Sequence, residues 1–120
     1  MKGRDLNNHI MALVSKSLNR YGIITLVTST LSKEEKRQRL REILPGYIEI
    51  YCKCSLAAAK KRDPKGLYLF SLIGIIPDFA DISASYNEHG SPDLVVNTET
   101  FSKEESLEQI LLFLDKKSII

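Results

Sequence analysis

A charged turn in the middle of the chain carries the side chains best suited to bind an anion. The run RDPKGLY, residues 62–68, places two cationic donors, Arg62 and Lys65, on either side of a proline. Guanidinium and ammonium groups both bind phosphate or carboxylate. Pro64 disfavours helical backbone in the residue before it, and Gly66 adopts conformations that other residues resist. From turn chemistry alone, the simpler interpretation is a surface turn that ends a helix.

The elements around this turn alternate along the chain. A short helix is expected over 55–61, directly before the turn, and an apolar run, 67–76, follows it. The hydrophobic spacing predicts three further helices and three strands. The helices are expected near 6–18, 32–44 and 102–114, and the strands at Ile23–Thr30, Tyr47–Cys54 and Leu94–Asn97. Strands that alternate with helices predict an α/β fold with parallel strands.

Serine and glutamate spacing predicts where two of the helices begin. Ser32 with Glu35, and Ser102 with Glu105, have the spacing of a capping box. The helix after Ser32 is rich in lysine and arginine, and we interpret it as an ordinary solvated face.

Composition limits the class of protein. The 120 residues are 43% hydrophobic, which is enough for a core, and the net charge is only +2. We therefore expect neither nucleic acid nor a membrane surface as the main partner. No apolar run approaches the roughly 20 residues that span a bilayer, so we expect a cytoplasmic protein. Cys52 and Cys54 lack further cysteine or nearby histidine for zinc, and we expect them to be small buried hydrophobes.

The run RDPKGLY, after an apolar strand and a short helix, resembles the signature of the adenylylsulfate kinases. These P-loop enzymes use ATP to phosphorylate the 3′-hydroxyl of adenosine 5′-phosphosulfate (APS) in sulfate assimilation, giving 3′-phosphoadenosine 5′-phosphosulfate (PAPS). The resemblance covers nearly the whole chain and aligns with the C-terminal two thirds of the family. It implies a three-layer, P-loop-kinase-like parallel sheet that lacks the first strands and the phosphate loop. Residues 1–120 would then form a partial adenylylsulfate-kinase-like domain.

The resemblance also implies residues that bind APS. The family's Arg-x-Glu-Asn stretch is matched here by Arg4 and Asn7, but Leu6 replaces the glutamate, and His9 and Ile10 replace an arginine pair. Without the resemblance, Arg4 and Asn7 would be interpreted as a polar pair at a helix start, where asparagine is a good cap.

Three further site residues follow from the same alignment. By resemblance, Lys65 lies near APS and Arg62 near the base of the nucleotide. Phe79 aligns with a phenylalanine that stacks on the APS adenine, and an aromatic ring suits a purine. The alternative for Phe79 is an ordinary core or loop anchor.

The parts that carry out phosphoryl transfer are missing from the sequence. No G-x-x-x-x-G-K-[ST] run occurs in the 120 residues, and the family's Asp-Gly-Asp strand end is also absent. The lid that follows the turn in the family is basic, but Leu69–Ile73 is uncharged here. We therefore assign no catalytic or metal-binding residue. Mg²⁺ with ATP is expected only if a phosphate loop is supplied, and no cofactor is expected for this chain alone.

Two explanations of this pattern stay open at this stage. The chain is either a fragment of an ordinary kinase, inactive alone, or a degenerate relative that binds APS, PAPS or ATP without catalysis. A regulatory domain would belong to the second explanation, and a pure oligomerisation module is a third class. In the family, the strand that carries the phosphate loop lies between the strands equivalent to Ile23–Thr30 and Tyr47–Cys54. Its absence leaves a gap in the sheet, which is closed either by direct pairing of these two strands or by another chain. Of the two, we expect a homo-oligomer or a partner domain to cover the exposed edges.

Overall fold

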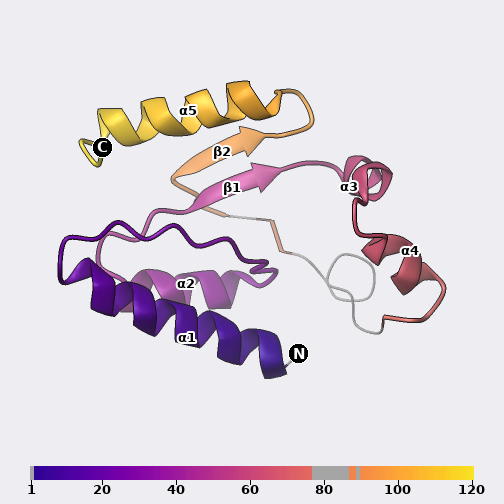
Figure 1. Cartoon of the computed structure of the whole chain (residues 1–120), viewed down its shortest axis with the longest axis horizontal. Coiled ribbons are helices and arrows are strands. Elements are labelled where there is room, and N and C mark those ends of the chain that lie inside the picture. Colours follow the sequence, from indigo (N-terminus) through magenta and orange to yellow (C-terminus); the bar gives the residue numbers. More distant parts are fainter. Residues whose placement is uncertain (1, 77–86, 89) are drawn as a thin grey trace.

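The computed structural model describes residues 2–76, 87–88 and 90–120, and it has two parallel strands flanked by helices (Figure 1). This confirms the predicted α/β class with a parallel sheet. The helices are α1 (Lys2–Asn19), α2 (Glu34–Ile43), α3 (Leu56–Arg62), α4 (Leu67–Leu72) and α5 (Lys103–Lys116), and the strands are β1 (Ile50–Lys53) and β2 (Leu94–Asn97).

The two strands pair in parallel, with Ile50 opposite Leu94 and Lys53 opposite Asn97. The ladder is extended at both ends by hydrogen bonds from flanking residues. The Leu94 N–H donates to the Glu49 carbonyl at 3.2 Å, and the Thr98 N–H donates to the Lys53 carbonyl at 2.9 Å. β2 has the bounds predicted for the last strand, and β1 is the central part of the strand predicted over 47–54.

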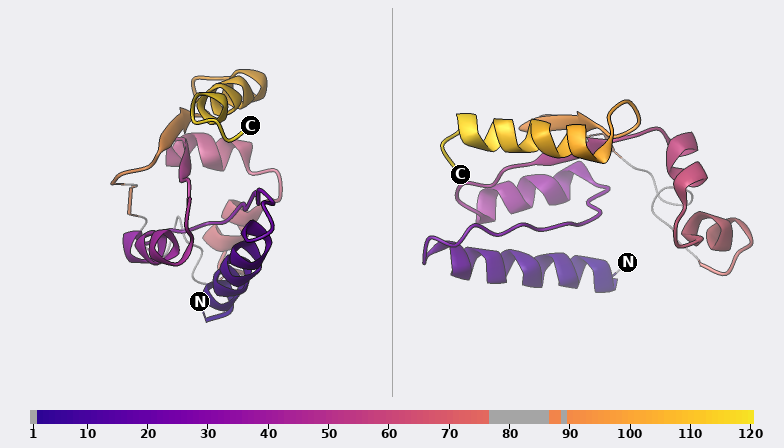
Figure 2. Two further views of the ribbon diagram at one scale, coloured as in Figure 1. Left: turned by 90° about the vertical axis from the view of Figure 1, so that its left-hand side faces the viewer. Right: turned by 45° about the horizontal axis from the view of Figure 1, so that its top comes forward.

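The helices lie in separate places around this sheet. α5 packs beside β2, whereas α1 and α2 lie together beyond β1, as Figure 2 shows from two further directions. α3 and α4 follow β1 at one end of the molecule, and the N-terminus of α1 points toward the same end (Figures 1 and 2). The carboxyl ends of the strands and the N-terminus of α1 therefore face one side of the molecule.

The predicted strand over Ile23–Thr30 is wrong for this structure. These residues have no regular secondary structure in the chain as described. A strand needs a neighbour with which to exchange backbone hydrogen bonds, and the described sheet consists of β1 and β2 paired with each other. The apolar side chains of this segment are consequently open to solvent, and Leu26 is 89% exposed.

Side-chain caps define the starts of two helices. The Ser102 hydroxyl accepts a hydrogen bond from the Glu105 N–H, and the Glu105 carboxylate accepts one from the Ser102 N–H. The predicted capping box at α5 is therefore confirmed. The box predicted at Ser32 and Glu35 is wrong, because α2 begins at Glu34 after Lys33. The Ser32 carbonyl instead accepts from the Asn87 N–H at 2.8 Å, which holds this serine outside the helix.

Very little of the apolar side-chain surface is buried. Among the described hydrophobic residues only Ala12 and Val96 are buried, and the predicted apolar face of α1 lies open, with Leu6, Ile10, Leu13 and Val14 all exposed. Cys52 is also exposed and Cys54 is half-buried, so the expectation of two buried cysteines was wrong. In the part of the chain that the structure describes, β1 pairs only with β2.

The start of α3 depends on a carboxylate from the segment after β2. Glu99 accepts hydrogen bonds from the Ser55 N–H at 2.9 Å and the Ser55 hydroxyl at 3.1 Å, and these bonds lower the pKa of Glu99 below its usual 4.5. A carboxyl group whose pKa is lower in the folded than in the unfolded state stabilises the fold at pH values above its unfolded-state pKa. This stabilisation is lost as the pH falls through the folded-state pKa.

We therefore expect the urea unfolding midpoint to fall as the pH is brought from neutral to below 4.5. Glu99→Gln removes the titrating group and should show a smaller fall. Glu108→Gln, at an exposed position on α5, is the matched control. Equal falls in the two variants would show that Glu99 does not contribute to the pH dependence.

Candidate functional site

The turn between α3 and α4 is held by its own carboxylate. Asp63 accepts hydrogen bonds from the backbone N–H groups of Tyr68 at 3.3 Å and Leu69 at 3.2 Å. Gly66 has a φ of 65°, in the left-handed region that glycine occupies without strain. The residues of the RDPKGLY run thus form a fixed turn, and Asp63 is engaged with the start of α4.

Arg62, at the end of α3, joins this turn to the end of β2. Its guanidinium donates to the Thr98 carbonyl at 2.6 Å and to the Thr98 hydroxyl at 3.3 Å. Arg62 and Thr98 line a hollow of about 510 Å³ together with Phe101, Lys103 and Ser106. In parallel α/β sheets, ligands bind beyond the carboxyl ends of the strands, which is where this hollow lies.

The hollow combines charge, an aromatic ring and an unused hydroxyl. Phe101 is half-exposed, Lys103 adds a second cation, and the Ser106 Oγ is buried without a hydrogen-bond partner among the described residues. Sequence reasoning missed Phe101, Lys103 and Ser106. The signal available was their position directly after the last predicted strand, where ligand-binding residues of parallel sheets gather.

Lys65 lies on the same turn as Arg62 and is exposed to solvent. The structure brings Arg62 and Lys65 together on one short segment, on opposite sides of Pro64. Among the described residues, no hydrogen bond or ion pair holds the Lys65 ammonium, so the side chain can meet a ligand in solution.

Arg4 and Asn7 lie in the first turns of α1, at the end of the molecule where α3 and α4 also lie (Figure 1). Asn7 makes a weak contact, from its Nδ2 to the Met11 sulfur at 3.8 Å. Asp5, between Arg4 and Asn7 in the sequence, forms a hydrogen-bonded ion pair with Lys36 of α2. The hydrogen bond from Lys36 lowers the pKa of Asp5. The first turn of α1 is thus tied to α2. Phe79 lies outside the described residues.

Sequence reasoning also missed the role of one arginine in α2. Arg37 was interpreted as part of a solvated basic face, but it is only 1% exposed. It forms an ion pair with Glu34 and donates to the carbonyls of Leu31, Asn87 at 2.9 Å and Glu88 at 3.1 Å. Spacing could not reveal this, because the bonded carbonyls belong to distant loops. Arg37 therefore fixes the start of α2 against residues 87–88.

A second arginine of α2 extends this network. Arg41 forms ion pairs with Glu49 at 3.4 Å and Asp93 at 3.3 Å, and its guanidinium lies over the Tyr47 ring at 5.2 Å. Asp93 also accepts from the Glu49 N–H at 2.8 Å. These contacts tie α2 to the entry of both strands, so the cations of this helix serve the fold.

The turn and the hollow bring three cations near one another, namely Arg62, Lys65 and Lys103. Among the described residues, no group of three or more histidine, cysteine, aspartate or glutamate side chains is arranged to hold a metal ion. No helix in the described part is long and apolar enough to cross a membrane. The arrangement is suited to binding an anionic ligand with an aromatic part.

Comparison with known proteins decides the family. The sequence model of the family described as adenylylsulphate kinase matches residues 1–97 of this chain. The chain belongs to the adenylylsulfate kinase family. This confirms the resemblance inferred from the sequence, and the matched range includes Arg4, Asn7, Arg62 and Lys65.

Curated relatives of this adenylylsulfate kinase family member are similar over most of its length. The adenylyl-sulfate kinase of Staphylococcus carnosus is 40% identical over 109 residues, which are 89% of this chain and 55% of the relative. That of Oceanobacillus iheyensis is 40% identical over 119 residues, 98% of this chain and 60% of the relative. A probable bifunctional SAT/APS kinase of Sorangium cellulosum is 34% identical over 94% of this chain and 19% of its own length. The chain thus spans 55–60% of the Staphylococcus carnosus and Oceanobacillus iheyensis kinases and a smaller share of the bifunctional protein.

A solved structure supports the fold assignment. The structure titled "Crystal structure of APE1195" has a TM-score of 0.79 and 29% identity, and the match covers 98% of this chain and 67% of that one. The P-loop-kinase-like fold predicted from the sequence is thereby confirmed. The family match ends at Asn97, so the hollow-lining residues Phe101, Lys103 and Ser106 lie beyond it.

Proposed function

We propose that this chain is the substrate-side part of an adenylylsulfate kinase, inactive alone, with residues 1–120 forming a partial kinase domain. It binds APS or PAPS beside the turn 62–68 and the base of ATP at the hollow. The main support for this proposal is the RDPKGLY turn. Its backbone is fixed by internal hydrogen bonds, it carries two cations, and it lies within the range that matches the family.

The two cations have different surroundings, which supports different roles. Lys65 is exposed, and we assign it to the phosphosulfate end of APS together with Arg4 and Asn7. Arg62 lines the hollow, where Phe101 offers a ring on which a purine can stack, and we assign this side to the nucleotide base. Phe79 is proposed for the APS adenine, by resemblance alone.

The chain would not supply phosphoryl transfer by itself. Mg²⁺ would arrive with ATP and act only when a phosphate loop is present, so we derive no step through the metal. We further propose a cytoplasmic place in sulfate assimilation, as for the family.

A non-catalytic regulatory or oligomerisation module is the second candidate. The observation that favours it is the segment after the turn, where α4 presents the exposed apolar residues Leu69, Phe70 and Leu72 in place of cations. A module of this kind that binds nucleotide would share the APS site. An oligomerisation module alone would not bind APS.

Calorimetric titration with APS, PAPS and ATP tests the proposal. We expect APS and PAPS to bind better than ATP. Lys65→Ala should weaken APS binding by about 1.5–3 kcal/mol, roughly 10- to 150-fold, because a charge-assisted contact is lost. Lys61→Ala removes an exposed cation from the neighbouring helix and should leave binding unchanged. Equal loss in both variants would indicate a nonspecific charge effect, and no APS binding by the unaltered chain would refute the proposal.

A further inference from the structure

The short helix α3 is held in place by polar bonds at both of its ends. At its start, Glu99 accepts hydrogen bonds from the backbone N–H and the hydroxyl of Ser55. At its end, Arg62 donates to the carbonyl and the hydroxyl of Thr98. None of the seven residues of α3 is buried, so apolar packing contributes little to the position of this helix. The position of α3 therefore depends on two adjacent residues, Thr98 and Glu99.

The segment after β2 gives these two residues a fixed backbone. The side-chain oxygen of Asn97 accepts hydrogen bonds from the N–H groups of Glu99 at 3.1 Å and Thr100 at 3.2 Å, which closes a tight turn. Thr98 is bonded to the end of β1, because its N–H and its hydroxyl both donate to the Lys53 carbonyl, at 2.9 and 3.2 Å. The turn is thus anchored to the sheet, and α3 is anchored to the turn.

We propose that Glu99 is a positioning residue for the nucleotide base and that it acts through Arg62. Its bonds to Ser55 fix the start of α3, and the helix then places the Arg62 guanidinium in the hollow beside Phe101. A helix of seven residues is about 10 Å long, so a tilt at its start moves the side chain at its end. The described residues that line the hollow include Arg62 but not Glu99. The inference rests on the proposed assignment of this hollow to the base of ATP.

The charge of Glu99 distinguishes positioning from a direct electrostatic effect. ATP is a polyanion, and a carboxylate near its site disfavours binding. Removal of Glu99 would therefore strengthen ATP binding if only charge mattered. Loss of the bonds to Ser55 instead frees α3 and the arginine at its end, which weakens ATP binding. The two explanations predict changes of opposite sign.

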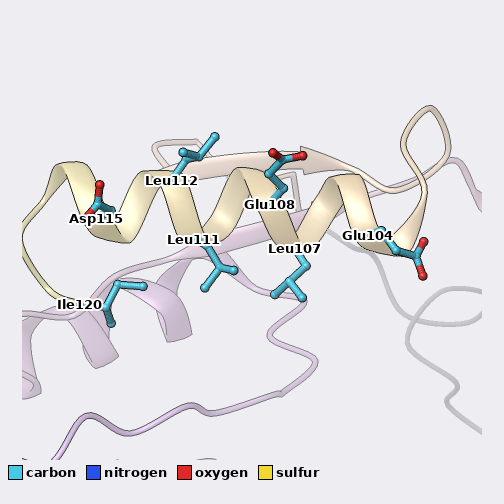
Figure 3. Close-up of a pocket in the computed structure, with 7 residues that line it drawn as sticks. All are labelled: Glu104, Leu107, Glu108, Leu111, Leu112, Asp115 and Ile120. Atoms are coloured by element: carbon cyan, nitrogen blue, oxygen red, sulfur yellow. The ribbon is translucent and has the colours of Figure 1, made fainter.

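An ATP titration of the full chain, followed by nuclear magnetic resonance, measures this change even at low affinity. Glu99→Ala should raise the ATP dissociation constant about fivefold, the effect of about one net hydrogen bond. Glu99→Gln keeps an acceptor for the Ser55 N–H and should show a smaller rise, so the test stands even if Glu99→Ala does not fold. Glu108→Ala removes the same charge from α5, where Glu108 borders a different hollow of about 620 Å³ (Figure 3), and should leave the constant unchanged.

Combination with Arg62→Ala tests whether Glu99 acts through that arginine. Arg62→Ala alone should weaken ATP binding, and addition of Glu99→Ala should cause no further loss, because the side chain that Glu99 positions is already gone. A second measurement needs no nucleotide. The Arg62 Nη–H protons should exchange with water faster in Glu99→Ala than in the unaltered chain or in Glu108→Ala, because their bonds to Thr98 open more often.

The outcomes separate this inference from the function on which it rests. Tighter ATP binding by Glu99→Ala, additive losses in the double variant, or unchanged exchange of the Arg62 protons would each overturn the positioning role and leave the base assigned to the hollow. An Arg62→Ala variant that binds ATP as well as the unaltered chain, or an unaltered chain that binds no ATP, would overturn both.

Discussion

The pure chain, incubated with ATP, magnesium and APS, is expected to form no detectable PAPS. Phosphoryl transfer in this fold depends on positioning the phosphates and on stabilising their charge. The loss of one preorganised donor typically costs about 10²–10³ in rate. A whole phosphate loop with its lysine is absent from the 120 residues, so we expect activity more than about 10³-fold below that of a complete enzyme.

The full-length Staphylococcus carnosus relative, assayed at the same concentration, is the positive control. The measurement is the amount of radiolabelled phosphate transferred to APS, with a sample lacking APS as the blank. Product from the chain alone above this blank would mean that phosphate is bound by residues other than a P-loop. Adding the part of the Staphylococcus carnosus relative that this chain does not match, as a separate polypeptide, should restore activity if the chain is the substrate-side part of a kinase. A non-catalytic module would stay inactive.

Replacing the buried arginine of α2 should cause the largest loss of stability. Arg37→Met keeps much of the side-chain volume but removes the bonds to Glu34 and to the carbonyls of residues 31, 87 and 88. Breaking a buried charge network by removing one partner typically costs about 3–5 kcal/mol. We expect a loss of this size in the free energy of unfolding of the chain, measured by urea denaturation.

Arg39→Met is the matched control, because Arg39 is exposed on the same helix. It should change stability by less than about 0.5 kcal/mol. If both substitutions had equally small effects, the Arg37 network would contribute nothing measurable. Amide exchange at Asn87 should also rise in Arg37→Met and stay unchanged in Arg39→Met.

The parts of the fold that could be predicted are those determined locally. β2 has the predicted bounds, the Ser102 box caps α5, and the turn at 62–68 follows a helix close to the one predicted over 55–61, whereas the helix α4 after the turn was predicted only as an apolar run. Each of these features depends on residues a few positions apart, so it can be predicted from the local sequence. The candidate site was predicted to the same extent, since Arg62 and Lys65 lie on one such local turn.

The features that sequence reasoning missed depend on distant partners. Residues 23–30 have the composition of a strand, but a strand also needs a neighbour, and composition does not supply one. Arg37 differs from Arg39 only in which loops it meets, and Phe101 enters the hollow only because Arg62 arrives from another helix. Periodicity identifies a face of a helix and does not tell what lies opposite it.

The internal bonds of the RDPKGLY turn have a consequence for its electric field. A carboxylate between two cations would ordinarily offset half of their positive charge. Asp63 is instead directed back to the N–H groups of Tyr68 and Leu69, so its negative charge is shared with the first turn of α4. Arg62, Asp63 and Lys65 together carry a formal charge of +1. An approaching polyanion is therefore attracted to the turn, and the Asp63 carboxylate is occupied by the backbone of α4 rather than by either cation.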